Sequence, residues 1–126
     1  MQPVIWYALI VLALVWYLYR IVRSRSIIHY TPTQVSEKLK NDKASLLLDV
    51  RTDAERKESF IKGSIHIPLH QLRSKAGELQ RFRTREIICY CRSGNRSVSA
   101  ALILRKLGFT AASMRGGLVE WNFSGQ

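Results

Sequence analysis

The stretch Ile87-Ile88-Cys89-Tyr90-Cys91-Arg92-Ser93-Gly94-Asn95-Arg96-Ser97 decides how the rest of this 126-residue chain is interpreted. It begins as a short apolar run, passes through a glycine-containing loop rich in arginine and serine, and enters a segment with helical periodicity. A cysteine between a strand and a helix N-terminus lies where backbone N–H groups and the helix dipole favour a thiolate. The stretch therefore predicts that Cys91 is a nucleophile acting on an anionic substrate.

The loop after Cys91 has the composition of an anion-binding site. Two arginines add positive charge, successive peptide N–H groups can form a nest, and the glycine can adopt a positive φ. The candidate binding residues are Arg92, Ser93, Gly94, Asn95, Arg96 and Ser97. Cys89 lies inside the apolar run instead, so we expect it to be a packed core residue.

Short apolar runs alternate with helix-like segments along most of the chain. Strands are predicted at 46–50, 65–67, 86–90 and 111–114, and helices start at Thr31-Pro32, near Thr52, and over 71–80, 97–107 and 118–123. This alternation predicts an α/β fold with a parallel sheet covered on both faces. Because sites in such sheets lie beyond the carboxyl ends of the strands, Asp49-Val50-Arg51 is expected beside Cys91.

The N-terminus predicts a membrane anchor. Residues 4–19 carry no charge, aromatic residues lie near both ends, and three arginines (Arg20, Arg23 and Arg25) follow. A buried core helix would show a polar face, and a cleaved signal peptide would begin with basic residues. We therefore expect a transmembrane helix at 1–22, a linker at 23–29 and a folded domain at 30–126. The positive-inside rule places that domain in the cytoplasm, most simply at a bacterial inner membrane.

Charge and cysteine content restrict the partners. Removing the three arginines after the anchor from the 20 basic side chains leaves 17 against 9 acidic ones, a net charge of +8 for the rest of the chain. Two interpretations stay open, a solvated basic face and a face near anionic lipid headgroups. Nucleic acid is not expected, since no aromatic interleaving or binding motif is present. A disulfide between Cys89 and Cys91 would be strained, and the sequence predicts no metal site and no cofactor.

Four segments together resemble one known family. They are Leu47-Leu48-Asp49-Val50-Arg51, Gly63-Ser64-Ile65-His66-Ile67-Pro68-Leu69, the run from Cys91 to Ser97, and Gly116-Gly117 with Trp121. In this order they resemble a single-domain rhodanese (thiosulfate sulfurtransferase family), here preceded by a membrane anchor. The resemblance covers the chain from Tyr30 to its end, and it implies a five-stranded parallel sheet flanked by helices.

The resemblance also implies a reaction and roles for residues. Cys91 would take a sulfane sulfur from a small anionic donor, thiosulfate or a persulfide, and pass it to a thiol or to cyanide. Backbone N–H groups from Arg92 to Arg96 would cradle the sulfur. Asp49 and Arg51 match the family's Asp-x-Arg strand end, and we expect them to brace the loop through an ion pair between Asp49 and Arg96.

Two alternatives to sulfur transfer are weighed against these residues. Related phosphatases and arsenate reductases need Cys-x5-Arg, but the residue six positions after Cys91 is Ser97. A membrane-tethered binding or adaptor module is the second alternative, and retention of the cysteine disfavours it. The chain departs from the family at Ser59-Phe60, where members often carry Gly-His. The sequence leaves the donor, the acceptor and the oligomeric state open.

Overall fold

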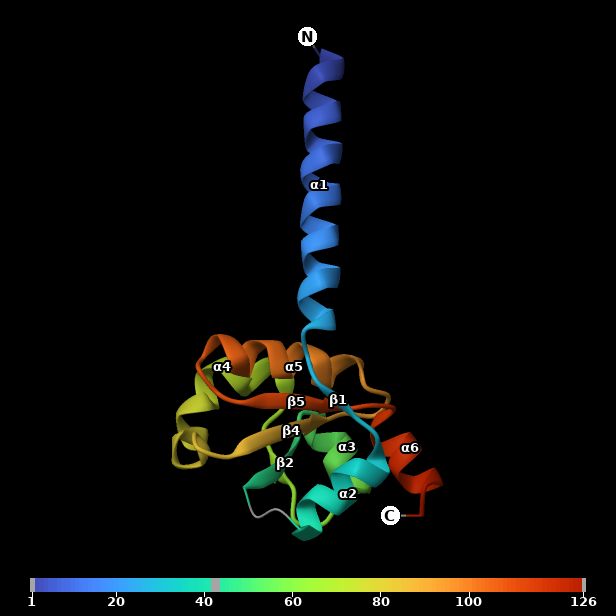
Figure 1. The fold of residues 1–126 in the computed structure, drawn as a ribbon, viewed down its shortest axis with the longest axis vertical. Coiled ribbons are helices and arrows are strands. Elements are labelled where there is room, and N and C mark those ends of the chain that lie inside the picture. Colours follow the sequence, from blue (N-terminus) through green and yellow to red (C-terminus); the bar gives the residue numbers. More distant parts are fainter. Residues whose placement is uncertain (1, 42–43, 126) are drawn as a thin grey trace.

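A five-stranded parallel sheet forms the centre of the folded domain in the computed structural model, which describes residues 2–41 and 44–125 (Figure 1). The strand order is β1-β5-β4-β2-β3, and every neighbouring pair is parallel. The strands are β1 (His29–Tyr30), β2 (Ser45–Asp49), β3 (Ile65–His66), β4 (Glu86–Tyr90) and β5 (Ala111–Met114). The parallel sheet predicted from the sequence is confirmed. The outermost residues of the predicted domains, Met1 and Gln126, lie outside the described residues.

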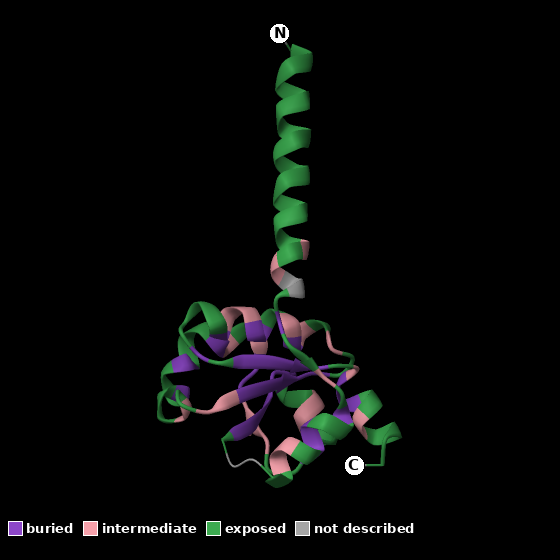
Figure 2. Cartoon of the chain, viewed as in Figure 1, coloured by how far each residue is buried: buried purple, intermediate pink, exposed green. Residues whose placement is uncertain are grey.

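Helices cover both faces of this sheet. One layer contains α4 (Leu72–Lys75), the 3-10 segments Leu69–Gln71 and Ala76–Phe82, and α5 (Asn95–Lys106). The other contains α2 (Pro32–Asn41), α3 (Asp53–Glu58) and α6 (Gly117–Phe123) (Figure 1). Successive side chains of a strand point to opposite faces of the sheet, so each helical layer has its own hydrophobic core. Leu46 and Leu48 pack in the core under α4 and α5, whereas Leu47 packs in the core under α2 and α6. The central strands are therefore buried, apart from the partly exposed Glu86 at the start of β4 (Figure 2).

Local signals fix the ends of several helices as predicted. The Thr31 hydroxyl accepts a hydrogen bond from the Gln34 N–H at 3.2 Å, and Pro32 occupies the first position of α2. Thr52 caps α3 in the same way, with Glu55 completing a capping box. The continuous helix predicted over 71–80 is wrong. That segment divides into α4 and a 3-10 stretch containing Gly77, a residue with low helix propensity.

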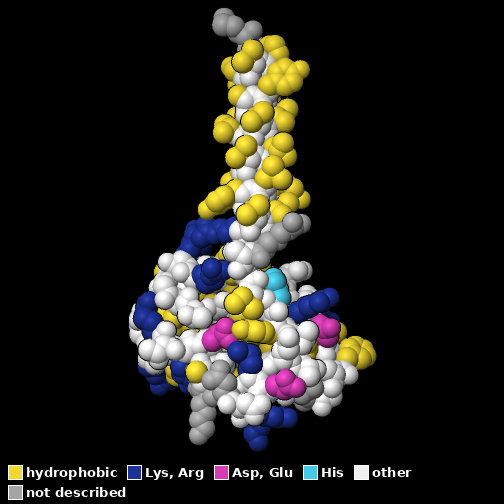
Figure 3. Space-filling view, viewed as in Figure 1, with side chains coloured by type: hydrophobic (Ala, Val, Ile, Leu, Met, Phe, Trp, Pro, Cys, Tyr) yellow, Lys and Arg dark blue, Asp and Glu magenta, His cyan; other side chains and the backbone are white. Residues whose placement is uncertain are grey.

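A long apolar helix, α1 (Gln2–Arg25), stands away from the domain (Figures 1 and 3). The most apolar window of 18 residues within Gln2–Arg23 has a mean hydropathy of 1.9, and none of that window is buried against the domain. The helix is thus long and apolar enough to cross a bilayer. It extends three residues into the linker predicted at 23–29 and contacts the domain through α5.

Candidate active site

Cys91 lies directly after β4, at the carboxyl edge of the sheet. Asp49 and Tyr90 are register partners in adjacent strands, and the Val50 N–H donates to the Tyr90 carbonyl at 3.1 Å. The segments after β2 and β4 therefore run side by side although about forty residues separate them in sequence. The predicted proximity of Cys91 to Asp49-Val50-Arg51 is confirmed.

The loop after Cys91 folds back so that a backbone donor faces the sulfur. Gly94 has φ +108° and lies at the N-cap of α5, and its N–H donates to the Cys91 Sγ at 3.0 Å. A positive φ at this position is accessible to glycine at little cost. The Cys91 side chain is nearly buried, with 1% of the residue exposed. A negative charge on this sulfur would be stabilised by the Gly94 N–H and by the N-terminus of α5.

Two buried serines lie beneath the sulfur. The Cys91 Sγ lies 3.7 Å from the Ser97 Oγ, which donates to the Gly94 carbonyl at 3.0 Å. Ser113 on β5 is 2.7 Å from the same Ser97 hydroxyl, and both serines are fully buried. The hydroxyls thus tie the Cys91 loop to β5. Sequence analysis found Ser97 and missed Ser113, whose signal was a polar residue inside a short buried strand.

Arg96 forms an ion pair with Glu55 and not with Asp49, so the predicted Asp49–Arg96 pair is wrong. Its Nη1 and Nη2 donate to the two Glu55 carboxylate oxygens at 2.6 and 2.8 Å. Hydrogen bonds from Arg96 lower the pKa of Glu55 to about 2. Glu55 was missed as a site residue, although its capping-box position in the first turn of α3 places it at the same edge of the sheet.

Asp49 is bound by other donors and is fully buried. Its Oδ1 accepts from the Arg51 backbone N–H and Nε at 2.9 and 3.0 Å, and its Oδ2 accepts from the Arg51 Nη2 and the Tyr90 hydroxyl at 2.8 and 2.9 Å. Arg56 adds a longer contact of 3.3 Å. Burial acts to raise the pKa of Asp49, but the bonds from Arg51 outweigh it and the pKa is lowered. This pair orders the segment after β2, next to the Cys91 loop.

The Gly116-Gly117 pair lets α6 approach the backbone of the cysteine loop. The Leu118 N–H donates to the Cys91 carbonyl at 2.8 Å, and the Val119 N–H donates to the Arg92 carbonyl at 3.1 Å. Gly117 has φ +59°, and a Cβ there would lie 2.6 Å from the Arg92 carbonyl carbon. Gly117, far from Cys91 in sequence, is thus required for the close approach of α6 to the cysteine loop.

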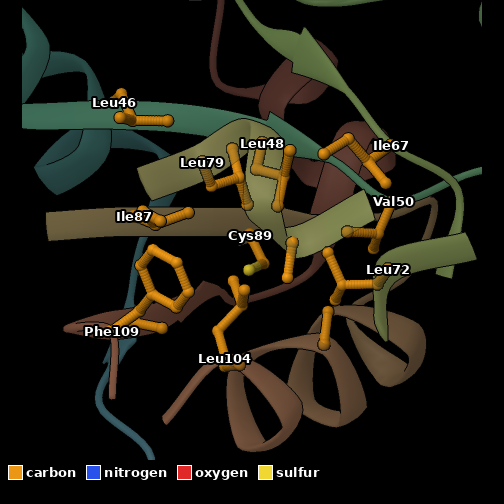
Figure 4. Packing of buried hydrophobic residues seen from close by; sticks show 14 of the residues in the cluster. Leu46, Leu48, Val50, Ile67, Leu72, Leu79, Ile87, Cys89, Leu104 and Phe109 are labelled. Atoms are coloured by element: carbon orange, nitrogen blue, oxygen red, sulfur yellow. The ribbon is translucent and has the colours of Figure 1, made fainter. Parts of the chain in front are cut away.

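Cys89 differs from Cys91 in its surroundings. Its sulfur points into the core among Leu48, Ile87, Leu104 and Phe109 (Figure 4). Burial raises the pKa of the Cys89 thiol, which keeps it protonated at neutral pH. The expectation that Cys89 is a packed core residue is confirmed.

Two hollows flank the cysteine loop. One of about 270 Å³ contains Arg51, Glu55, Arg92, Leu118 and Asn122 in its lining. The other, of about 280 Å³, is lined by Val50, Thr52, Pro68, Leu69, His70 and Arg96. Each includes an arginine of the loop, but the first hollow is also lined by two carboxylates, Glu55 and Glu58, so its lining is mixed in charge. Within residues 2–41 and 44–125, no cluster of three or more His, Cys, Asp or Glu side chains could hold a metal.

The chain is an α/β protein with a parallel sheet, and its candidate site is a buried cysteine in the loop between β4 and α5. The chain belongs to the rhodanese-like family, since the family profile described as "Rhodanese-like domain" matches residues 31–124.

Named relatives agree with this assignment. A sulfurtransferase of Allochromatium vinosum is 32% identical over 88 residues, which cover 69% of this chain and 80% of the relative. A putative sulfurtransferase of Bacillus subtilis, YtwF, is also 32% identical, over 69% of this chain and 82% of its own. A rhodanese-related protein from Thermoplasma volcanium superposes with a TM-score of 0.70 at 32% identity, covering 78% of this chain and 93% of that one. The chain is thus similar to sulfurtransferases over its folded domain.

Proposed function

We propose that this protein is a membrane-anchored sulfurtransferase in which Cys91 carries the sulfur as a persulfide. The observation that carries the proposal is the Gly94 N–H at 3.0 Å from the Cys91 Sγ, at the N-terminus of α5. A positioned donor and a helix N-terminus favour the thiolate that sulfur transfer requires. The family assignment supplies the reaction class, and the donor and acceptor are proposed from their chemistry.

The first half-reaction transfers sulfur to the enzyme. The Cys91 thiolate attacks the outer sulfur of thiosulfate, the sulfur–sulfur bond of the donor breaks, and sulfite leaves with the electron pair. A low-molecular-weight persulfide can serve in the same way, with its thiolate as the leaving group. The outer persulfide sulfur on Cys91 is then held in the loop that the Gly94 N–H lines.

The second half-reaction passes the sulfur on. A thiolate or cyanide attacks the outer sulfur of the persulfide, and the Cys91 thiolate leaves, so no external oxidant or reductant is needed. The hollows lined by Arg92 and by Arg96 give an acceptor two approaches to the loop. Arg92 and Arg96 at these hollows can attract anionic donors and acceptors, while Glu55 and Glu58 make the first hollow the less positive of the two.

The anchor gives the enzyme its place in the cell. The exposed apolar α1 supports insertion into a membrane, and the arginines at its C-terminal end support a cytoplasmic domain. We expect the full chain to float with vesicles in a density gradient after an alkaline wash. A chain recovered from the bottom of the gradient would contradict the anchor.

Mass spectrometry of thiosulfate-treated protein tests the sulfur chemistry. The wild type should gain the mass of one sulfur atom on Cys91 and none on Cys89, and it should form thiocyanate when cyanide is added. Cys91→Ser should abolish both signals. Cys89→Ser, the matched control in the buried strand, should retain them. A full-length, folded wild type that forms neither adduct nor thiocyanate would refute the proposal, and a cellular role that survives Cys91→Ser would favour an adaptor.

A further inference from the structure

A basic hollow lies where α1 meets α5. It has a volume of about 230 Å³ and is lined by Arg23, Ser26, Leu102, Arg105 and Lys106. The Arg105 Nη1 donates to the Ser26 carbonyl at 2.8 Å and lies 3.3 Å from the Ser26 hydroxyl. This bond connects the end of α1 to the last turn of α5, so the hollow is built from two elements and differs from the site around Cys91.

The hollow gathers three cations without an acidic partner. In the described part of the chain, no carboxylate lies within ion-pair distance of Arg23, Arg105 or Lys106. Like charges brought together repel, and a bound anion relieves that repulsion. The Arg23 Nη1 instead contacts the Tyr19 hydroxyl at 3.3 Å, on the membrane side of the hollow.

Charge is distributed unevenly between the two helical layers. In the layer beside the anchor, α4, α5 and the two 3-10 segments contain several arginines and lysines and one acidic residue, Glu78. The anchor helix α1 itself contains arginine and no acidic residue. The opposite layer, α2, α3 and α6, is mixed in charge. It contains five acidic residues (Glu37, Asp53, Glu55, Glu58 and Glu120) and four basic ones (Lys38, Lys40, Arg56 and Lys57). In Figure 3, lysine and arginine side chains lie directly beneath the apolar rod, whereas the visible acidic ones lie farther from it. The layer that α1 would hold against a membrane is therefore the basic one.

The length of α1 places the hollow at the depth of lipid phosphates. At about 1.5 Å per residue, the span Gln2–Arg23 is about 33 Å long, close to the roughly 30 Å of a hydrocarbon core. Arg23 then lies at the membrane surface, and Ser26 lies three residues beyond it. The headgroup layer starts at this level, so a phosphodiester and the hollow would meet at the same depth.

We propose that this hollow binds the phosphate headgroup of an anionic glycerophospholipid, which holds the α4–α5 layer against the membrane. The proposal rests on the proposed insertion of α1. Arg23, Arg105 and Lys106 pair with the phosphate oxygens, and the Ser26 hydroxyl lies at the same mouth. An anionic lipid is favoured over a zwitterionic one because its headgroup carries no cation to oppose the three on the protein.

Native mass spectrometry of the full chain in a nonionic detergent tests the inference. Phosphatidylglycerol and phosphatidylcholine are added in equal amounts, and the ratio of their adducts is measured. The wild type should retain phosphatidylglycerol at least about tenfold more than phosphatidylcholine, a lower bound for the attraction of two basic side chains to anionic lipid. The variant Arg105→Gln/Lys106→Gln should reduce this ratio at least fivefold, while sulfur transfer in detergent is unchanged.

A matched control variant, a competition with inorganic phosphate and a flotation assay separate a wrong binding site from a wrong ligand and from a wrong anchor. Lys57→Gln/Lys62→Gln removes the same charge near α3, in the opposite layer, and should keep the wild-type ratio. An equal fall in both variants would overturn the site in favour of general charge attraction. A wild-type ratio near one would overturn the preference for an anionic headgroup. Displacement of the lipid by excess inorganic phosphate would show a free-anion site and overturn the lipid assignment. Flotation with phosphatidylcholine vesicles tests α1 separately. Loss of flotation would refute the anchor and with it the docking of the α4–α5 layer on a membrane, whereas the adduct ratio measures the headgroup preference of the hollow itself.

Discussion

Replacement of Asp49 by asparagine tests the electrostatic arrangement beside Cys91. The Asp49 Oδ1 accepts from the Arg51 backbone and Nε, and the Oδ2 accepts from the Arg51 Nη2, the Arg56 Nη1 and the Tyr90 hydroxyl. An amide NH₂ in place of Oδ2 would direct donors at two guanidinium groups. Arg51 is 3% exposed, so its charge would be left buried without a counter-charge.

The expected loss is large because the surviving partner cannot move into water. Breaking a buried ion pair by removing one charge costs about 3–5 kcal/mol, a considerable share of the roughly 5–15 kcal/mol that stabilises a typical domain. Urea unfolding of the full chain in detergent, followed by circular dichroism, measures this difference. Asp53→Asn is the control, since its side chain is 74% exposed and its loss should cost under about 0.5 kcal/mol.

The pH dependence provides a second measurement of the same pair. The pKa of Asp49 is below its ordinary value of 3.8, so its contribution to stability is complete above pH 3.8 and is lost as the pH falls through the folded-state pKa. The stability gap between wild type and Asp49→Asn should therefore narrow below pH 3.8. If Asp49→Asn is as stable as Asp53→Asn but loses sulfur transfer, Asp49 acts on the cysteine loop. The interpretation that Asp49 serves to hold Arg51, while Arg96 is held by Glu55, is then refuted.

Three further substitutions address the parts of the site in turn. Glu55→Gln should lower the free energy of unfolding by about 1 kcal/mol at neutral pH, the usual value for a partly exposed ion pair. Because the pKa of Glu55 is about 2, urea titrations should show the wild type more stable above pH 4.5, with this difference lost toward pH 2. A difference between wild type and variant that does not change with pH would contradict the pairing with Arg96. Ser97→Ala should lower kcat/KM for sulfur transfer about fivefold, as expected for one neutral hydrogen bond near the sulfur, and an unchanged rate would exclude that contact from the reaction. Gly117→Ala should abolish transfer and destabilise the domain, because its Cβ would meet the Arg92 carbonyl, whereas Gly77→Ala, which has open space around it, should be tolerated in the same assays.

Much of the fold followed from features that act over a few residues. Apolar runs identified the central strands, and threonine caps located the starts of α2 and α3. The proximity of Cys91 to the end of β2 also followed, since carboxyl ends of parallel strands share one edge. These predictions succeeded because short-range chemistry and sheet topology both determine them.

The partners of individual charges could not be predicted in the same way. Asp49 had three arginines within plausible reach, and the sequence does not say which of them the folded chain brings closest. Arg51 is two residues from Asp49 and donates three hydrogen bonds to it. Arg96 forms its ion pair with Glu55 instead. Ser113 was missed for a similar reason, because its importance comes from the position of Ser97 on α5, across the sheet surface.

The pairing of Arg51 with Asp49 and of Arg96 with Glu55 changes which group is expected to stabilise charge on the sulfur. The motif places two arginines after Cys91, and their charge alone suggests that they hold the thiolate. However, Arg96 is bound by both oxygens of Glu55, so much of its field at the sulfur is offset by that carboxylate. The Gly94 N–H at 3.0 Å has no such competitor in the described hydrogen bonds, and it points at the sulfur because α5 begins there. For the proposed sulfur transfer, we therefore expect backbone geometry, set by Gly94 and protected by Gly117, to contribute more than the arginines to holding a charged sulfur, and we expect the arginines to act on substrates as they approach.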